Sequence, residues 1–292
     1  MATIGFIGTG GMGAGMAANL IKAGHSLVVT DLNRAQSAGL EAKGARFVDS
    51  AKAVAENCEL VLSMLPHNDA VRAVGLGKGG LVEATKGARE WIDFSSIDKA
   101  TIVEVGGVLA GKGWNIADAS AGGVEEVAAA GQLALWLSGS RAMFDAHQPV
   151  LKAMGKSILF VGELGAAKLV KNAMAMLAAV QHMSLVEVGC WLKKGGIDDA
   201  TFKTILENSQ QDSVGVRRIM EIVVSRAFKP RKSWMPKDVG FGLDMARDME
   251  VPMPFVGLAS QMFAIAQATG QDGYEATGIA CNVYDVINGS KK

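Results

Sequence analysis

Residues 3–31 of the chain, TIGFIGTGGMGAGMAANLIKAGHSLVVTD, decide the fold. The segment opens with a β-branched and aromatic run of the kind that forms buried strands. Three glycines in the spacing G-x-G-x-x-G follow at once: Gly8, Gly10 and Gly13. We expect a helix over residues 12–23 and a second strand over residues 26–30, which ends at Asp31. Strand, glycine turn, helix and strand together predict the first unit of an open parallel sheet.

The glycine turn also predicts a binding site for a dinucleotide. Glycines let the backbone approach a pyrophosphate closely, and the N-terminus of the following helix attracts its negative charge. The residues expected to hold it are Gly8, Gly10, Gly11, Met12 and Gly13. Asp31 is suited to accept hydrogen bonds from an adenosine ribose and to repel a 2′-phosphate, which favours NAD. The neighbouring Arg34 leaves NADP open as the alternative.

Apolar runs separated by helical segments continue to about residue 162, which predicts an α/β domain with a doubly wound sheet. The expected strands are residues 60–65, 91–94, 115–118, 133–137 and 157–161. Ligands of such sheets bind at the carboxyl ends of the strands. We therefore expect Leu65, Pro66 and Ser96 to contact the cofactor, although Ser96 is equally suited to cap the following helix. A second set of glycines with the G-x-G-x-x-G spacing has no strand before it and is interpreted as a surface turn: Gly75, Gly77 and Gly80.

A long apolar segment, residues 163–194, follows the last expected strand and contains no proline. A helix that is apolar on nearly every face is normally buried. Lys168 and Asn172 are four positions apart, so their side chains leave the same face of this helix near its start. Only helical patterns follow. We therefore divide the chain into a sheet domain, residues 1–162, an interdomain helix, residues 163–194, and an all-α C-terminal domain, residues 195–292.

The bulk composition is that of an ordinary globular protein, with 49% hydrophobic residues. Lysine plus arginine and aspartate plus glutamate number 29 each, a balance that favours neither nucleic acid nor an anionic membrane as partner. The three cysteines do not suit a disulfide framework, and the four histidines form no metal-binding spacing. The N-terminus does not resemble a signal peptide, and no apolar run reaches about 18 residues. We expect a soluble, cytoplasmic protein that acts on a small molecule without a metal ion.

Six motifs in a fixed order make the chain resemble the β-hydroxyacid dehydrogenase family, the group of 3-hydroxyisobutyrate dehydrogenase, tartronate semialdehyde reductase and relatives of 6-phosphogluconate dehydrogenase. The motifs are IGFIGTGGMGAGMAANLIKAGH at residues 4–25, SMLP at 63–66, DFSSI at 93–97, DASAGG to GQL at 118–133, KLVKN at 168–172 and PKDVG at 236–240. The resemblance covers essentially the whole chain. The order and spacing of the six motifs are far more specific than any single motif.

The resemblance implies a Rossmann domain, an interdomain helix and a helical C-terminal domain, with reversible NAD(P)-linked oxidation of a small β-hydroxy acid to its semialdehyde or ketone. It implies that Lys168 is the general acid/base and that Asn172 orients the substrate. Lys171 is the competing lysine, but Ala175, four positions further on, cannot form a side-chain hydrogen bond. Lys237 matches a lysine that reaches over the cofactor or the substrate in the family. A homodimer or homotetramer is expected by the same analogy.

The chain also departs from the family at the loop that contacts the substrate. The family sequence is Asp-Ala-Pro-Val-Ser-Gly-Gly, whereas this chain has Ser120, Gly122 and Val124 at the proline, the serine and the second glycine. We still expect Ser120, Gly122 and Gly123 to contact the substrate, the glycines through their backbone N–H groups. The lead-in to the interdomain helix is also shorter than usual. An imine reductase-like enzyme on the same scaffold and a non-catalytic dinucleotide-binding protein are the alternatives.

Overall fold

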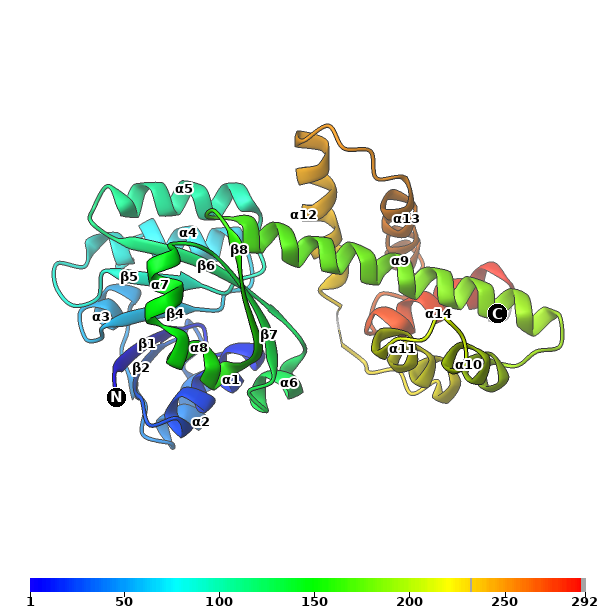
Figure 1. Cartoon of the computed structure of the whole chain (residues 1–292), viewed down its shortest axis with the longest axis horizontal. Coiled ribbons are helices and arrows are strands. Elements are labelled where there is room, and N and C mark those ends of the chain that lie inside the picture. The colour runs from blue at the N-terminus through cyan, green and yellow to red at the C-terminus, as the bar shows by residue number, and fades with distance from the viewer. Residues whose placement is uncertain (232, 290–292) are drawn as a thin grey trace. The chain divides into compact units, whose positions relative to one another are not determined.

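The computed structural model describes residues 1–231 and 233–289 of the chain and consists of two compact units. The first unit comprises residues 1–171, and the second comprises residues 172–292. The boundary lies inside one long helix, α9 (Ala166–Lys194), whose first turns belong to the first unit. The fold class predicted from the sequence is confirmed, because a sheet domain leads through this helix into an all-α domain (Figure 1).

An eight-stranded sheet forms the centre of the first unit, with the strand order β3-β2-β1-β4-β5-β6-β7-β8. Its strands are β1 (Thr3–Ile7), β2 (Ser26–Thr30), β3 (Arg46–Phe47), β4 (Leu60–Ser63), β5 (Glu90–Asp93), β6 (Asn115–Gly122), β7 (Leu133–Gly139) and β8 (Gly155–Gly162). Strands β1 to β6 are parallel, whereas β7 pairs antiparallel with β6 and parallel with β8. The carboxyl ends of the first six strands therefore lie at one edge, and the connection from β6 to β7 lies at the same edge.

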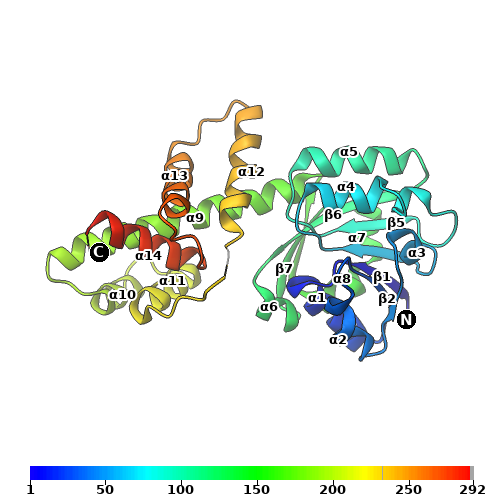
Figure 2. The same cartoon turned by 180° about the vertical axis from the view of Figure 1, so that it is seen from behind.

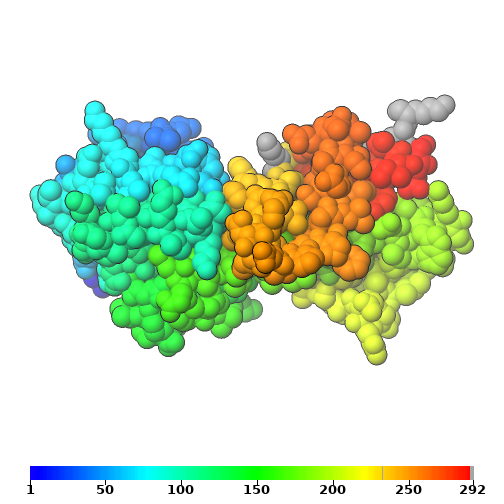
Figure 3. All heavy atoms as spheres, turned by 90° about the horizontal axis from the view of Figure 1, so that it is seen from above, coloured from blue at the N-terminus to red at the C-terminus, as the bar shows by residue number. Residues whose placement is uncertain are grey.

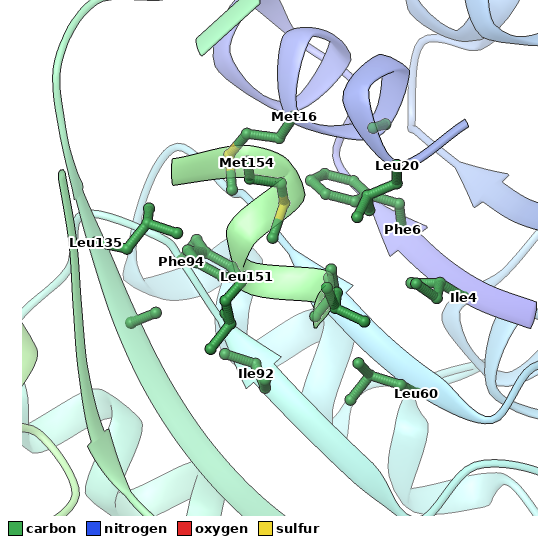
Figure 4. Packing of buried hydrophobic residues seen from close by; sticks show 14 of the residues in the cluster. Ile4, Phe6, Met16, Leu20, Leu60, Ile92, Phe94, Leu135, Leu151 and Met154 are labelled. Atoms are coloured by element: carbon green, nitrogen blue, oxygen red, sulfur yellow. The ribbon is translucent and has the colours of Figure 1, made fainter. Parts of the chain in front are cut away.

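Helices cover both faces of the sheet. One face packs against α1 (Gly11–Lys22), α2 (Ala38–Glu41), α6 (Glu125–Ala129), α7 (Arg141–Ala146) and α8 (Gln148–Met154). The other face packs against α3 (Ala51–Ala55), α4 (Asn68–Leu76) and α5 (Lys99–Ala110). Because successive strand residues point to opposite faces and both faces are covered, the central strands are apolar at nearly every position. Figure 4 shows Met16 of α1 and Met154 of α8 packed around Phe6 of β1.

Three details of the first unit differ from the sequence predictions. The two-residue strand β3 was not predicted, because it is too short to form a recognisable apolar pattern. The reversed direction of β7 and β8 was also not predicted, because an apolar run does not reveal its direction. The interpretation of the second glycine set as a surface turn is wrong at Gly75. This residue lies within α4, where a Cβ atom would come within 2.3 Å of Cγ1 of Val105 on α5.

The second unit, in its described part, contains helices and no strand (Figure 2). The continuation of α9 packs with α10 (Asp199–Glu207), α11 (Val214–Ser225), α12 (Met235–Asp248), α13 (Pro254–Ala268) and α14 (Ala276–Ile287). Side chains of Asp198, Ser213 and Glu275 accept backbone N–H groups at the starts of α10, α11 and α14, which explains where these helices begin. Helix α13, orange in Figure 3, forms part of the surface and exposes Phe255 and Leu258.

Helix α9 has the length and composition that would suffice to cross a membrane. A long core helix of a globular protein passes the same test, and α9 has that role in the second unit. Its side chains Met176, Ala179 and Met183 are buried there with Phe202 and Phe263. Packing between helices therefore explains part of the apolar character of α9, while Leu177 and Trp191 of the same helix are exposed.

Candidate active site

The glycine turn between β1 and α1 has the backbone that the sequence predicts. Gly8 has a φ of +89°, a conformation that residues with a Cβ atom rarely adopt. A Cβ atom on Gly8 would lie 2.3 Å from the carbonyl oxygen of Met64, and one on Gly13 would lie 2.0 Å from the carbonyl oxygen of Gly8. Packing within the protein therefore requires glycine at both positions, because the turn folds tightly on itself and against the end of β4.

Gly10 differs from its two neighbours in the motif. A Cβ atom built on Gly10 would have no protein atom within 4 Å, and its φ of −64° is accessible to any residue. Packing thus does not explain this glycine. It leaves open space directly at the N-terminus of α1, whose first residues are Gly11 and Met12 and whose backbone N–H groups attract anions. The space and the positive end of the helix suit a pyrophosphate that approaches the backbone closely.

Asp31 lies at the carboxyl end of β2, next to this turn. One of its carboxylate oxygens accepts a hydrogen bond from the backbone N–H of Thr9 at 2.7 Å, and the other accepts one from Asn33 N at 2.9 Å. These two contacts fix the direction of the carboxylate relative to the glycine turn. Oδ2 also accepts the Thr9 hydroxyl group at 3.4 Å, whereas Oδ1 retains a lone pair with which the carboxylate can accept a hydrogen bond from a ribose. The neighbouring Arg34 forms an ion pair with Glu41.

A second acidic side chain, Glu125, lies at the same turn and was not predicted as a cofactor residue. It opens α6, and Asn19 of α1 holds the other end of that helix through a 2.8 Å hydrogen bond from Nδ2 to Ala128 O. A Cβ atom on Gly11 would lie only 2.2 Å from Oε1 of Glu125. The carboxylate therefore lies beside the first residue of α1, where a pyrophosphate is expected.

The carboxyl ends of β4 and β5 are joined by side-chain hydrogen bonds. Leu65 N, just after β4, donates to Ser95 Oγ at 2.9 Å, which holds the segment containing Leu65 and Pro66 beside the end of β5. Ser96 follows Ser95 and is half-buried. The suggestion that Ser96 caps the next helix is wrong, because Asp98 accepts the N–H of Thr101 at 2.7 Å and caps α5.

The first turn of α9 is held by two side chains that are distant in sequence. Asp118 of β6 accepts a hydrogen bond from Gly165 N at 2.8 Å, and Ser138 of β7 accepts one from Ala167 N at 2.9 Å. The Ser138 hydroxyl in turn donates to Asp118. These contacts satisfy backbone N–H groups that a helix start leaves without partners. They explain how α9 begins despite its short lead-in.

Lys168 of α9 is fully buried, with no exposed surface on its side chain. Its Nζ donates to the Asp93 carbonyl oxygen at 2.8 Å, to Asp93 Oδ2 at 2.9 Å and to the Ala119 carbonyl oxygen at 2.9 Å. An ammonium group has three N–H bonds, so all of them are used. The acid/base role of Lys168 stays a prediction, because the hydrogen bonds of a catalytic group can rearrange when a substrate binds.

Lys171 lies one turn further along α9 and is half-buried. Its Nζ donates to the carbonyl oxygen of Ala121 at 3.1 Å, and no further hydrogen bond of this amine occurs within residues 1–231 and 233–289. Ala121 is nearer than Ala119 to the carboxyl end of β6, which is the edge where ligands of such sheets bind. Lys171 therefore combines partial exposure with available N–H bonds at the expected edge.

The other two residues expected near the reaction belong to the second unit. Asn172 of α9 is buried, and neither its Nδ2 nor its Oδ1 has a hydrogen-bond partner among the described residues. A buried amide without partners is unfavourable, so it marks a place where a ligand or water would bind. Lys237 lies in the first turn of α12, with Nζ 5.3 Å from the ring centre of Trp234 and 5.6 Å from that of Phe241. Roles of Asn172 and Lys237 toward a ligand stay predictions.

The loop expected to bind the substrate is shaped by an indole. A Cβ atom on Gly122 would lie 2.7 Å from the ring of Trp136, which projects from β7. A side chain at position 122 would therefore require the Trp136 ring to move. Ser120, two residues earlier, is buried, and its hydroxyl has no partner among the described residues. Gly123 follows with a φ of +146°.

Asp93, Ser138 and Trp136 contribute to this region, and sequence reasoning assigned them no role. A signal for Asp93 was present, because a carboxylate at the end of a buried apolar strand requires a cation or several donors. Trp136 gave no signal, because its contact with Gly122 depends on the pairing of β6 with β7. No group of His, Cys, Asp and Glu able to hold a metal ion occurs among residues 1–231 and 233–289. Burial raises the pKa of the Cys58 and Cys281 thiols to about 12, so neither is a nucleophilic thiolate at neutral pH.

Comparison with known families adds independent evidence. Residues 3–162 match the NAD binding domain of 6-phosphogluconate dehydrogenase, and residues 165–290 match the domain described as NAD-binding of NADP-dependent 3-hydroxyisobutyrate dehydrogenase. The chain is 32% identical to 2-(hydroxymethyl)glutarate dehydrogenase of Eubacterium barkeri over 98% of its own length and 96% of that protein. It is also 32% identical to 3-hydroxyisobutyrate dehydrogenase of Pseudomonas aeruginosa over 93% of its own length and 94% of that protein.

Comparison with solved structures also indicates a hydroxyacid dehydrogenase. The structure of Mycobacterium tuberculosis 3-hydroxyisobutyrate dehydrogenase with L-serine has a TM-score of 0.89 and 26% identity, covering 97% of this chain and 99% of that one. An imine reductase from Myxococcus stipitatus has a TM-score of 0.63 and only 16% identity, with coverage of 97% and 99%. At that identity the similarity concerns the fold alone and does not support the imine reductase alternative.

Proposed function

The chain belongs to the β-hydroxyacid dehydrogenase family, and on that premise we propose that Lys168 transfers the proton in the oxidation of a small β-hydroxy acid to its semialdehyde or ketone. The protein is an NAD(P)-dependent oxidoreductase that acts on CH–OH groups. The observation that carries the proposal is the buried ammonium of Lys168 beside Asp93 at the end of β5, with the Asn172 amide one turn further along α9 buried and without a hydrogen-bond partner among the described residues. Lys171, half-buried with one hydrogen bond to Ala121, is the competing lysine.

The chemistry of the reaction requires a group such as Lys168. In the direction of oxidation, its neutral amine accepts the hydroxyl proton while hydride leaves the carbon atom. In the direction of reduction, its ammonium donates a proton to the oxygen on which negative charge develops. Lys168 is shielded from bulk water, and a substrate oxygen would take the place of one of the three oxygen atoms that it binds in this structure.

The residues around the glycine turn suit a dinucleotide cofactor, which supplies the nicotinamide that exchanges hydride with the substrate. We assign the pyrophosphate to Gly8, Gly10, Gly11, Met12 and Gly13, and the nicotinamide end to Leu65, Pro66 and Ser96. Asp31 is assigned to the adenosine ribose, and we propose that NAD is preferred over NADP. A large preference for NADP in kcat/KM would contradict this role of Asp31.

For the substrate, we propose that the loop after β6 holds the carboxylate through the backbone of Gly122 and Gly123. The Trp136 indole beside Gly122 then forms an apolar wall. Ser120, Asn172 and Lys237 are proposed to orient the substrate. A screen of short hydroxy acids for NADH formation, including hydroxyisobutyrate, serine, glycerate and 4-hydroxybutyrate, would identify the substrate.

The decisive experiment is a comparison of Lys168→Ala with Lys194→Ala, an exposed lysine at the far end of the same helix. We expect Lys168→Ala to lower kcat about 10³-fold, within the range for loss of a general acid/base, without loss of NADH binding. Lys194→Ala should keep the activity of the unmodified enzyme. Survival of kcat within a few-fold in Lys168→Ala would refute the proposed proton transfer, and a large loss in Lys171→Ala alone would assign it to Lys171.

We further propose that the protein is a cytoplasmic homodimer or homotetramer that associates through its second unit. Several large apolar side chains of that unit are exposed: Leu177, Trp191, Phe255 and Leu258. Extended apolar surface of this kind commonly marks an interface. Light scattering of the purified protein would test the proposal, and a monomer at micromolar concentration would contradict it.

A further inference from the structure

A serine hydroxyl on β6 is buried without a hydrogen-bond partner. Ser120 is 1% exposed, and its Oγ has no partner among residues 1–231 and 233–289. Most buried hydroxyl groups in proteins are paired, because an unpaired one has lost its hydrogen bonds to water without replacement. The family loop has proline at this position, so the hydroxyl belongs to this chain and not to the family pattern. An atom of a ligand that pairs with it would remove an unfavourable arrangement.

Strand register places Ser120 on the face of the sheet where α9 begins. In the pairing of β6 with β7, Asp118 lies opposite Ser138, and Ser120 lies opposite Trp136. Asp118 and Ser138 accept N–H groups from the first turn of α9. Side chains two residues apart on a strand point to the same face. Ser120 and Trp136 therefore also point to the face on which α9 begins.

Ser120 also lies between the two positions assigned to the ends of the substrate. Lys168 Nζ binds the carbonyl oxygen of Ala119, one residue before the serine. The carboxylate is assigned to the backbone of Gly122 and Gly123, on the other side of the serine. Residues 119 and 122 are about 10 Å apart along the strand, a distance that a three-carbon hydroxy acid spans with a hydrogen bond at each end. The middle carbon of such an acid would lie over Ser120.

Burial of the serine is compatible with this position, because the side chain of Lys168 has no exposed surface either. The two groups lie at adjacent residues of β6, on the same face of the sheet. A substrate that displaces an oxygen atom from the Lys168 amine therefore also reaches the Ser120 hydroxyl.

The Trp136 indole covers the same stretch of β6. Its ring lies 2.7 Å from a Cβ atom built on Gly122, and its backbone lies opposite Ser120. The ring thus fills the side-chain space from the serine to the start of the glycine loop. Because protein interiors are closely packed, a long substituent on the middle carbon of a substrate would meet this ring.

We propose that Ser120 and Trp136 select a β-hydroxy acid whose middle carbon carries a short polar substituent, a hydroxyl or an amino group. The proposal rests on the function proposed above. The Ser120 hydroxyl forms a hydrogen bond with the substituent, and the Trp136 ring excludes longer groups such as a second carboxylate. A methyl substituent is about as large as a hydroxyl, so it passes the ring but leaves the serine unpaired.

The experiment uses three substrates that differ only at the middle carbon: glycerate, serine and 3-hydroxyisobutyrate, with a hydroxyl, an amino and a methyl group. For the better of the two polar substrates, kcat/KM should exceed that for hydroxyisobutyrate by about 10-fold or more, since a site built to pair a polar group rejects the analogue that lacks it. Ser120→Ala should reduce this ratio to about threefold or less. Ser157→Ala, at an exposed serine on β8, is the control and should keep the ratio.

A stability measurement separates this role from a structural one. Since the Ser120 hydroxyl has no partner, Ser120→Ala should unfold in urea at the same midpoint as the unmodified protein or at a higher one. A serine that supported the fold would give a lower midpoint.

The indole is tested by Trp136→Leu with 2-ethyl-3-hydroxypropanoate, whose substituent is one carbon longer than methyl. Its kcat/KM relative to that of hydroxyisobutyrate should rise about 10-fold in the variant, because the smaller side chain leaves room for the extra carbon. An unchanged ratio would remove Trp136 from the proposal.

Two results for the serine would overturn the proposal. One is a preference of the unmodified enzyme for hydroxyisobutyrate over both polar substrates, and the other is the same substrate ratio in Ser120→Ala and Ser157→Ala. Failure of the proposed function is distinct from both, because it would appear as undiminished kcat in Lys168→Ala. The comparison of glycerate with serine identifies which polar group the site accepts.

Discussion

The glycine turn at β1 and the first turn of α9 both lie at the carboxyl edge of the sheet, and they differ in how their contacts arise. In the glycine turn, Gly8, Gly13 and Asp31 contact residues of the turn itself or the end of the adjacent strand β4. At α9, Lys168 is bound to Asp93, 75 residues away, and the helix is capped from β6 and β7. The first region is determined mainly by backbone geometry and the second by distant side-chain partners. In both regions the roles of the side chains toward a ligand stay predictions.

The largest effect that would test this difference is expected at the cap of α9. Asp118→Ala removes the acceptor of Gly165 N and the partner of the Ser138 hydroxyl, leaving two buried polar groups without partners. We expect a loss of about 3 kcal/mol in the free energy of unfolding. Urea unfolding would measure it, with Asp49→Ala, at an exposed position, as control. A loss no larger than that of the control would mean that α9 does not depend on distant caps.

A smaller effect, on binding and not on stability, is expected at Gly10. Because a Cβ atom there meets no protein atom within 4 Å, Gly10→Ala should leave the free energy of unfolding unchanged in the absence of cofactor. The methyl group should nevertheless obstruct a closely approaching pyrophosphate and weaken NADH binding by about 2 kcal/mol, roughly 30-fold. The matched control is Gly39→Ala on α2, where a Cβ atom is also unobstructed. Equal NADH affinities of the two variants would remove Gly10 from the site.

A buried thiol beneath the glycine turn predicts that the stability of the protein depends on pH. Cys58 packs under β1, with Sγ 2.8 Å from a Cβ atom built on Gly5, and burial raises the pKa of its thiol from 9.0 to about 12. A thiol pKa that is higher in the folded state than in the unfolded state gives stability that is fully present below the pKa of the unfolded state. This stability is lost as the pH rises through the pKa of the folded state.

Between pH 8 and pH 10, the unmodified protein should therefore lose about 1 kcal/mol more stability than Cys58→Ala. Chemical denaturation at the two pH values would measure the difference. Identical losses would indicate that the thiol is already accessible in the folded protein, and the packing beneath β1 would then be looser than described.

The smallest effect is expected where the glycine turn meets the loop after β6. The Glu125 carboxylate lies beside Gly11, and its negative charge should oppose a pyrophosphate at the start of α1. Glu125→Gln should therefore tighten NADH binding about twofold to threefold at low salt, and less at high salt. Glu126→Gln, one residue further on, is the comparison. Weaker binding in Glu125→Gln would show that the glutamate contributes a contact to the cofactor.

Some features of the site were predictable from the sequence and others were not. The strand limits Thr3–Ile7 and Ser26–Thr30 and the glycine geometry agree with prediction, because apolar periodicity and glycine spacing act over a few residues. The family was also identified correctly from motif order. The surroundings of Lys168 and Lys171 were not accessible in this way, because both lie on one helix between similar apolar residues. Which of the two is buried depends on which lysine meets Asp93 and Ala119 when β5, β6 and α9 come together.

The sequence by itself determined the α/β sheet, the dinucleotide turn and the long helix, since each follows from residue types at fixed local spacing, and the class of reaction followed from the resemblance to the family. Only the tertiary structure decided that Lys168 pairs with Asp93, that Asp118 and Ser138 hold the start of α9, and that the Trp136 ring lies beside Gly122. The physical reason is that an ammonium group has three N–H bonds and a small volume contains one side chain. Which group occupies them is settled by residues far apart in the chain.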